Sequence, residues 1–213
     1  MLKNVIFDYM GVIADIDYKK ILKNLTLMEK FKALRVLVGL KKNQTLKDAF
    51  SAYQTGNANH DDLMKATSEV YPNAASVLPK LLGLIPSGIK ENKAVLALAK
   101  KLHDDGFKII LLSKAIPETQ ERIQNSEFVT YFDGFVLSHL VGMKKPDREI
   151  YDFTCDVYEM NPLDTIMIDD KPENLIGAEE AKLKTMPCDK GPEVLAKRLG
   201  NLFYSQYQPQ PNE

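Results

Sequence analysis

Short apolar runs without polar alternation recur along the chain, and amphipathic stretches separate them. Strands of a parallel sheet are buried on both faces, so they consist of nearly uninterrupted Val, Ile, Leu, Phe and Met. Alternation of such strands with helices is typical of a doubly wound α/β sheet. The sequence therefore predicts this fold class, with strands at Asn4–Asp8, Lys108–Ser113, Gly134–Ser138, Thr165–Asp169 and Lys184–Pro187.

Apolar residues at helical spacing lie between these strands. Val95, Ala99 and Leu102 fall on one helix face, and Gly106 follows as the expected C-terminal cap. A similar pattern covers 150–157. Prolines tolerated in a first helical turn follow the predicted strands or loops at Pro117, Pro172 and Pro192.

Residues 17–90 break the alternation, because they show helical patterns and no convincing strand. In the second of three expected helical segments, Thr45 and Asp48 have the spacing of a capping box. The segments are 18–40, ending at Gly39; 45–57; and 60–72, ended by Pro72.

An insertion after the first strand would sit above the carboxyl ends of the strands, where open α/β sheets bind ligands. We therefore expect a helical cap at 17–87 that acts as a lid. The α/β core is expected at 1–16 and 88–205. The polar, proline-containing residues 206–213 are expected to be a disordered tail.

The composition adds limits on partners and location. The formal net charge is −1, so we expect neither nucleic acid nor a membrane as a partner. Cys155 and Cys188 lack metal-ligand spacing and are expected to be reduced thiols. The N-terminal apolar stretch is too short for a signal peptide. Together these features predict a cytoplasmic protein, and they leave its oligomeric state open.

Polar groups gather at the carboxyl ends of the predicted strands. Asp8 ends the first strand, and Ser113 ends the second. Lys144 and Lys145 precede an expected proline-initiated helix, which places a fixed cation at the same edge. Mg²⁺ prefers carboxylates, water and substrate oxygens as ligands, and a lysine and a hydroxyl can offset the remaining charge of a phosphate. The same edge also carries Asp169 and Asp170 at the end of a strand, and Asn174 just after them. Together these residues predict Mg²⁺-assisted phosphoryl transfer.

Four motifs in order, "FDYMGV", "LLSK", "GMKKPD" and "MIDDKPEN", resemble those of the haloacid dehalogenase (HAD) superfamily. The resemblance spans Asp8 to Asn174 and includes a helical cap after the first motif. The stretches "GMKKPDREIY" and "IDDKPENLIGAEEAKL" are most similar to the small phosphatases that act on sugar phosphates. The resemblance implies a Mg²⁺-dependent phosphatase of a small phosphorylated metabolite.

The same resemblance implies a role for each matching residue. Asp8 would be the nucleophile that forms an aspartyl-phosphate, and Lys145 would pair with it and with the phosphate. The implied substrate-binding residues are Ser113 and Asn174, with Asn174 also steadying the lysine or the acid pair. Lys114 is a further candidate to bind substrate, although it does not match the family residue. The implied Mg²⁺ ligands are Asp8, Asp169, Asp170 and the backbone carbonyl of Met10.

Two positions depart from the family pattern. Phosphatases of the superfamily usually carry a second Asp two residues after the nucleophile, which protonates the leaving oxygen and then activates water. Met10 stands there and can do neither, although general acid–base help is typically worth about 10²–10⁴-fold. Lys114 replaces the usual Asn, and the sequence leaves open whether it points into the site.

These departures keep other functions in view. One is a non-catalytic HAD-fold protein that binds a phosphorylated ligand or a protein. Another is a dehalogenase, which would not use Mg²⁺ and so fits the Asp169–Asp170 pair poorly. A phosphonate-cleaving enzyme would need a Schiff-base lysine from the cap, and no feature singles one out among Lys41, Lys42 and Lys47.

A few further side chains carry weaker expectations. Among the three histidines, His139 is the only plausible substrate contact. Lys144 is expected to be solvated, because only one lysine of its pair matches the motif. The cap aromatics Phe31, Phe50 and Tyr53 are expected to form the core of the lid.

Overall fold

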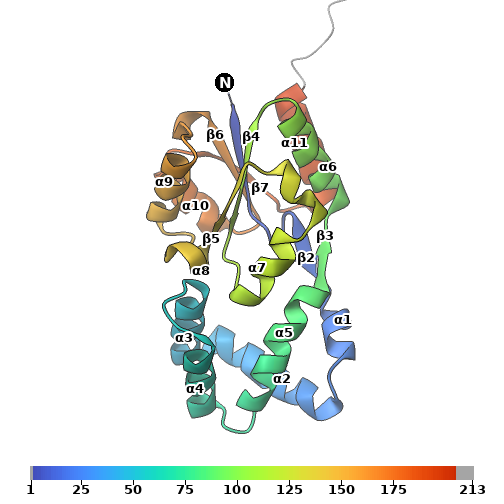
Figure 1. Cartoon of the computed structure of the whole chain (residues 1–213), viewed down its shortest axis with the longest axis vertical. Helices are drawn as coiled ribbons and strands as arrows, with labels where there is room; N and C mark the ends of the chain where they lie inside the picture. Colours follow the sequence, from blue (N-terminus) through green and yellow to red (C-terminus); the bar gives the residue numbers. More distant parts are fainter. Residues whose placement is uncertain (1, 205–213) are drawn as a thin grey trace, which may run out of the picture.

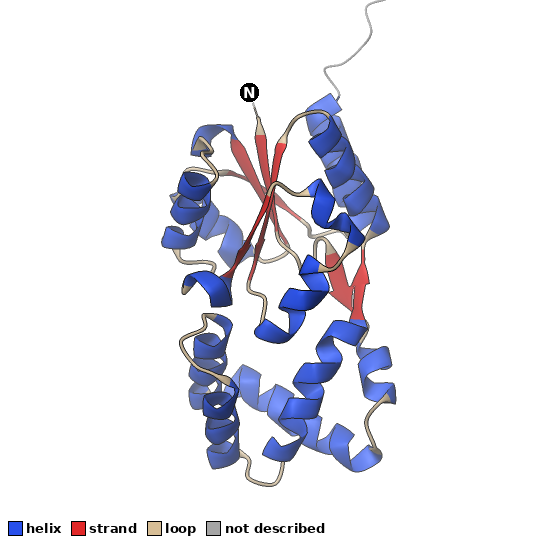
Figure 2. Cartoon of the chain, viewed as in Figure 1, coloured by secondary structure: helices blue, strands red, loops and turns tan. Residues whose placement is uncertain are grey.

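The sheet is parallel throughout and has β1 at its centre. A computed structural model describes residues 2–204 of the chain. The strand order is β5-β4-β1-β6-β7, flanked by helices (Figure 2). The predicted doubly wound α/β fold is confirmed. The strands are β1 (Asn4–Phe7), β4 (Lys108–Ser113), β5 (Gly134–Leu137), β6 (Thr165–Asp169) and β7 (Lys184–Pro187).

The predicted strands are found with small differences at their ends. Asp8 and Ser138, which the pattern predicts as the last strand residues, lie one residue beyond β1 and β5. The Asp8 amide still donates to the Ile168 carbonyl at 2.9 Å, so its side chain starts from the end of the sheet. Such a one-residue difference is within the usual uncertainty of element boundaries.

Successive strand residues point to opposite faces, and helices cover both. Phe7 and Leu111 pack in one apolar cluster, whereas Ile6 and Ile110 pack in another. The first face is covered by α6 (Lys93–Asp104), α7 (Pro117–Gln124), η2 (Glu127–Tyr131) and α11 (Pro192–Tyr204). The second is covered by α9 (Arg148–Val157) and α10 (Pro172–Glu180). Two short elements complete the core, α8 (Ser138–Val141) and η3 (Pro162–Asp164).

A group of helices lies beyond the carboxyl ends of the strands, at the lower end of Figure 1. It has its own apolar core, which includes Val36, Tyr53, Leu63 and Leu82. Its elements are α1 (Tyr18–Lys23), α2 (Leu27–Lys42), α3 (Gln44–Gln54), α4 (His60–Val70), η1 (Ala75–Val77) and α5 (Leu78–Gly88).

A two-stranded antiparallel ribbon joins the cap helices to the core. It pairs β2 (Ala14–Ile16) with β3 (Ile89–Glu91). The expectation of no strand up to residue 90 is therefore wrong at its end. Each strand is only three residues long and includes charged residues, which leaves too little pattern to detect. We propose that this ribbon marks the boundary between the core segments and the cap at 17–87.

Several predicted helix ends are corrected by the capping contacts. The segment 18–40 is two helices, because Thr26 and Glu29 form a capping box that starts α2, and α2 continues past Gly39. The cap of α3 is Asn43, not Thr45: its side chain accepts from the Leu46 amide at 3.1 Å. Pro146 does not start a helix either, because α9 begins at Arg148.

Two further expectations concern the C-terminal tail and a membrane as a partner. The tail at 206–213 lies outside the described residues. Among the helices that are described, none is long and apolar enough to cross a membrane.

The close packing of α10 against the loop that carries Lys145 gives a stability prediction. A Cβ at Gly177 would lie 1.9 Å from the Pro146 carbonyl oxygen, whereas a Cβ at Gly83 in α5 would meet nothing within 4 Å. We expect Gly177→Ala to lower the free energy of unfolding by about 1–3 kcal/mol. Gly83→Ala should stabilise by up to about 1 kcal/mol, because alanine favours helix. Urea unfolding checks both, and equal effects would contradict the packing.

Candidate active site

Three neighbouring strands bring their terminal polar residues together. In the sheet, β1 lies between β4 and β6, with Phe7 level with Leu111 and Ile168. Asp8, Ser113 and Asp169 therefore follow these positions at one edge, and all three are buried. The sequence placed these side chains at adjoining strand ends, and the structure brings them together.

The ammonium group of Lys145 is the centre of the site. Its Nζ lies 2.7 Å from Asp8 Oδ1 and 2.6 Å from Asp169 Oδ2, and it also donates to the Leu112 carbonyl at 3.0 Å. The Lys145 side chain is about 1% exposed. All three ammonium hydrogens thus have an acceptor, and the ion is held by charge-assisted hydrogen bonds in a position where it cannot swing to solvent.

Asp169 is fixed from its other oxygen. Its Oδ1 accepts the Lys171 amide at 2.9 Å and the Asn174 Nδ2 at 2.8 Å. The Tyr151 hydroxyl in turn donates to the Asn174 carbonyl at 2.6 Å, which ties the first turn of α10 to α9. The expected contact of Asn174 with the acid pair is present, and it orients the carboxylate that faces Lys145.

A divalent cation fits the three carboxylates. One oxygen each from Asp8, Asp169 and Asp170 lies within 4.8 Å of the others. Asp170 Oδ1 is buried and has no hydrogen-bond partner among the described residues, so it needs a cation or water. Oxygen ligands of this kind suit Mg²⁺.

The loop after Asp8 leaves space for the Asp170 carboxylate. The Gly11 amide donates to the Ala14 carbonyl, and the Ala14 amide to that of Tyr9, so these turn bonds do not use the Met10 carbonyl. Gly11 has φ +91°, and a Cβ there would lie 2.5 Å from the Asp170 carboxyl carbon. Only glycine leaves room for the Asp170 carboxylate at this close approach.

The two carboxylates that flank Lys145 have pKa values shifted in opposite directions. Burial raises the pKa of Asp8 to about 6, with Lys145 opposing the rise and Asp169 adding to it. Burial also acts on Asp169, but Lys145, the Lys171 amide and Asn174 together hold its pKa below the usual value. The same two carboxylates keep the pKa of Lys145 raised despite its burial. Asp169 is thus a permanent anion, and Asp8 can be protonated in mild acid.

A cavity of about 220 Å³ opens beside Asp8. Lys114 lines it, which answers the question the sequence left open about its direction. Burial lowers the pKa of Lys114, and the neighbouring Lys171 and Lys145 lower it further. Sequence reasoning missed Gln54, which belongs to no motif, and Lys171, which lies within "MIDDKPEN" but was given no role. The full lining is Asp8, Met10, Gln54, Ser113, Lys114, Lys145, Lys171 and Asn174.

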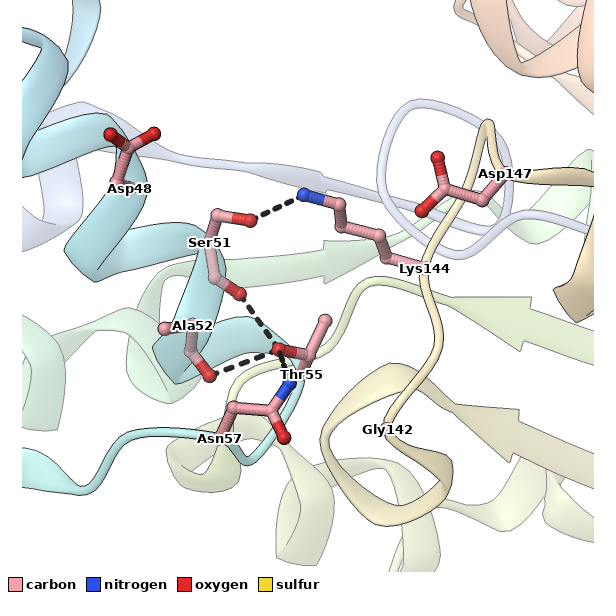
Figure 3. A pocket seen from close by; sticks show the side chains of 8 residues that line it. All are labelled: Asp48, Ser51, Ala52, Thr55, Asn57, Gly142, Lys144 and Asp147. Carbon is pink, nitrogen blue, oxygen red and sulfur yellow. Dashed lines mark hydrogen bonds between the residues drawn. The ribbon is translucent and has the colours of Figure 1, made fainter.

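The cap contacts the core around this cavity. Gln54 donates from α3 to the Lys114 carbonyl at 3.4 Å, and the Tyr53 hydroxyl donates to Glu118 at 2.6 Å. Lys144, expected to be solvated, instead donates to the Ser51 hydroxyl (Figure 3). This contact borders a second cavity of about 370 Å³ between α3 and the loop that holds Gly142, Lys144 and Asp147.

Two of the weaker expectations are corrected. The His139 ring nitrogens lie 2.9 Å from the Ala115 carbonyl and 2.8 Å from Gln120 Oε1, and His139 does not line the cavity beside Asp8. Tyr53 is buried and Phe50 packs against the cap core, but Phe31 is 60% exposed on α2.

Comparisons with known proteins agree with the fold. A family model described as haloacid dehalogenase-like hydrolase matches residues 2–182. D-ribitol-5-phosphate phosphatase from Bacteroides thetaiotaomicron is 24% identical over 208 residues, which cover 90% of this chain and 94% of that protein.

Two solved structures share the architecture. A predicted HAD-like family hydrolase from Porphyromonas gingivalis has a TM-score of 0.72 at 19% identity, covering 95% of this chain and 98% of the other. A HAD family enzyme from Bacteroides thetaiotaomicron, solved with magnesium and inorganic phosphate, has a TM-score of 0.69 at 20% identity, covering 88% and 94%.

The raised pKa of Asp8 gives a pH prediction for metal binding. Protonated Asp8 is a poor ligand, so its proton competes with Mg²⁺ below a pH of about 6. Between pH 7 and pH 5 we expect the Mg²⁺ Kd, measured by titration calorimetry, to rise by roughly tenfold. Asp8→Asn should bind Mg²⁺ more weakly at pH 7 and lose this part of the pH dependence. A wild-type Kd that does not change over this range would refute the assignment of Asp8 as a ligand.

Proposed function

The chain belongs to the haloacid dehalogenase-like hydrolases, and from that premise we propose that it is a Mg²⁺-dependent phosphatase of a small sugar or polyol phosphate. The observation that carries the proposal is the convergence of Asp8, Asp169 and Asp170 within 4.8 Å, beside the buried Lys145. A nucleophile, a cation and a metal-binding acid cluster are the parts that phosphoryl transfer requires. The full-length similarity to D-ribitol-5-phosphate phosphatase supports the substrate class.

The charges of the cavity suit a phosphate dianion. We assign phosphoryl binding to Ser113 and Lys145, and assign Lys114 to the substrate as an added cation. The described Lys114 and Lys171 side chains make no hydrogen bond within residues 2–204, so both are available to an anionic ligand in the cavity that they line. Bound Mg²⁺ would reduce the repulsion between Asp8 and the phosphoryl oxygens.

The proposed first step uses Asp8 as the nucleophile. An Asp8 carboxylate oxygen attacks the phosphorus, the bond from phosphorus to the substrate oxygen breaks, and that oxygen leaves with the electron pair and takes a proton. In the second step water attacks the aspartyl-phosphate, which releases phosphate and restores Asp8. Lys145 is positioned for the first step, because it holds an Asp8 oxygen at 2.7 Å.

Met10 stands where a proton-transfer group would protonate the leaving oxygen and activate water. Met10 lines the cavity, but its thioether has no proton to transfer. We propose that its role is the backbone carbonyl ligand to the metal, and that the proton on the leaving oxygen comes from water or from a cavity lysine. Hydrolysis of the aspartyl-phosphate, which needs a deprotonated water, is then the slower half of the reaction.

A phosphate-release assay tests this function. With Mg²⁺, the protein should release phosphate from ribitol 5-phosphate or from other members of a panel of pentitol, pentose and hexose phosphates, and EDTA should stop the reaction. Asp8→Asn should reduce kcat at least about 10³-fold, because the nucleophile is lost. Asp156→Asn, an exposed change on α9, is the matched control and should keep the wild-type rate.

Two results would reject the proposal. One is phosphate release that is equally slow in the wild type and Asp8→Asn. The other is ligand-induced thermal stabilisation without any turnover across the panel, which would instead support the non-catalytic binding protein.

A further inference from the structure

The outward face of α2 is apolar from Leu27 to Val38. Ala33, Val36 and Gly39 of this 16-residue helix are buried against the cap. On the opposite side, an apolar row recurs at the i, i+4, i+7 and i+11 spacing of a single helix face. Its members and their exposed fractions are Leu27 72%, Phe31 60%, Leu34 59% and Val38 40%, with Met28 66% and Leu37 39% beside them.

This concentration is unusual within the described chain. Six of the exposed large hydrophobic side chains lie on α2, two more lie on the preceding α1, and the others are spread singly over the core. At roughly 200 Å² for each large side chain, the six exposed fractions amount to about 670 Å² of apolar surface. Patches of that size mark interaction sites, and about 800 Å² per partner is typical of a stable interface.

The row has the register of a coiled-coil seam. Phe31 and Val38 occupy a positions and Leu27 and Leu34 occupy d positions of a heptad. If two copies of α2 run antiparallel, a positions meet d positions, so Phe31 packs on the partner's Leu34 and Leu27 on the partner's Val38. The face is thus complementary to itself about a two-fold axis, as a symmetric dimer requires.

The basic residues on the flanks fit the same register. Lys30 and Leu37 are the g positions, and Met28 and Arg35 are e positions. In the antiparallel pairing g meets g and e meets e, so Lys30 lies beside the partner's Leu37 and Arg35 beside the partner's Met28. Neither basic group faces another in these pairs, and each aliphatic stem covers an apolar neighbour while its charge stays in solvent. The one acid of α2, Glu29, is bound by Lys80 of the same chain at 2.9 Å.

We propose that the protein is a dimer in which α2 packs antiparallel against α2 of a second copy. The residues of this interface do not line the cavity beside Asp8, so the dimer leaves that site accessible. A second copy fits better than an acidic partner, because the face is a continuous apolar seam from Leu27 to Val38. Lys30 and Arg35 lie along its edges, and Lys41 and Lys42 lie beyond its C-terminal end.

Sedimentation velocity on the full chain tests the proposal. Over a range of micromolar concentrations, the wild type should sediment at about twice the 24.0 kDa chain mass. Leu34→Lys places a charge in the centre of the seam and should give a monomer. The matched control is Leu163→Lys, since Leu163 is 61% exposed in η3, and this variant should remain a dimer. Circular dichroism should be native for both, because both changes are at exposed positions.

Cysteine cross-linking tests the register. The double variant Leu27→Cys/Val38→Cys should form a disulfide-linked dimer on mild oxidation, because these positions face one another in the antiparallel pair. The native Cys155 and Cys188 are buried and should not interfere. Leu27→Cys alone should remain uncrosslinked, since it meets itself only in a parallel pairing.

Three outcomes would overturn the proposal. They are a wild type that is monomeric at all concentrations, a dimer that Leu34→Lys leaves intact, and efficient cross-linking of Leu27→Cys alone. Added salt gives a further test. A seam with screened basic edges should hold or tighten at higher salt. Self-association that weakens with salt would show that opposite charges, and not the apolar seam, hold the copies together, and would contradict the proposal.

Discussion

The arrangement of the site depends on one buried ion, the ammonium group of Lys145 between the carboxylates of Asp8 and Asp169. Charges in a low-dielectric interior are tolerated only when they are paired and fully hydrogen-bonded. The adjacent ends of β1, β4 and β6 supply these partners, and the close approach of Gly177 to Pro146 holds the lysine loop against α10. The ion pair with Lys145 also orients Asp8 toward the cavity. Stability and the proposed chemistry therefore depend on the same three residues, Lys145, Asp8 and Asp169.

Much of this could be predicted from sequence because it is local. Apolar runs gave the five strands of the sheet to within one residue, and parallel order implies that their polar end residues meet. The capping contacts were harder, since the side chains of Asn43 and Thr45 can both cap a helix. Only the structure shows that Asn43 accepts from the Leu46 amide. The ribbon of β2 and β3 was missed because three residues carry no measurable period.

Features that depend on the cap's position were beyond sequence reasoning. Gln54 donates to the carbonyl of Lys114, which lies 60 positions later in the sequence. Lys144 donates to the hydroxyl of Ser51, which lies 93 positions earlier. Phe31 was assigned to the cap core because it lies at helical spacing, yet α2 has two apolar faces and spacing alone does not tell which one is buried. Lys114 belongs to the motif "LLSK", but the motif does not tell whether its side chain enters the cavity that it lines in the structure.

We propose that Asp8 carries the phosphoryl group and that Met10 makes its removal slow. Mass spectrometry of peptides from acid-quenched enzyme, taken during turnover with Mg²⁺ and a reactive phosphate ester, tests it directly. We expect a phosphoryl adduct on the peptide that contains Asp8, at a level that falls when Met10→Asp supplies the missing proton-transfer group. Phosphate release with no adduct on Asp8, or with the adduct on another residue, would contradict it.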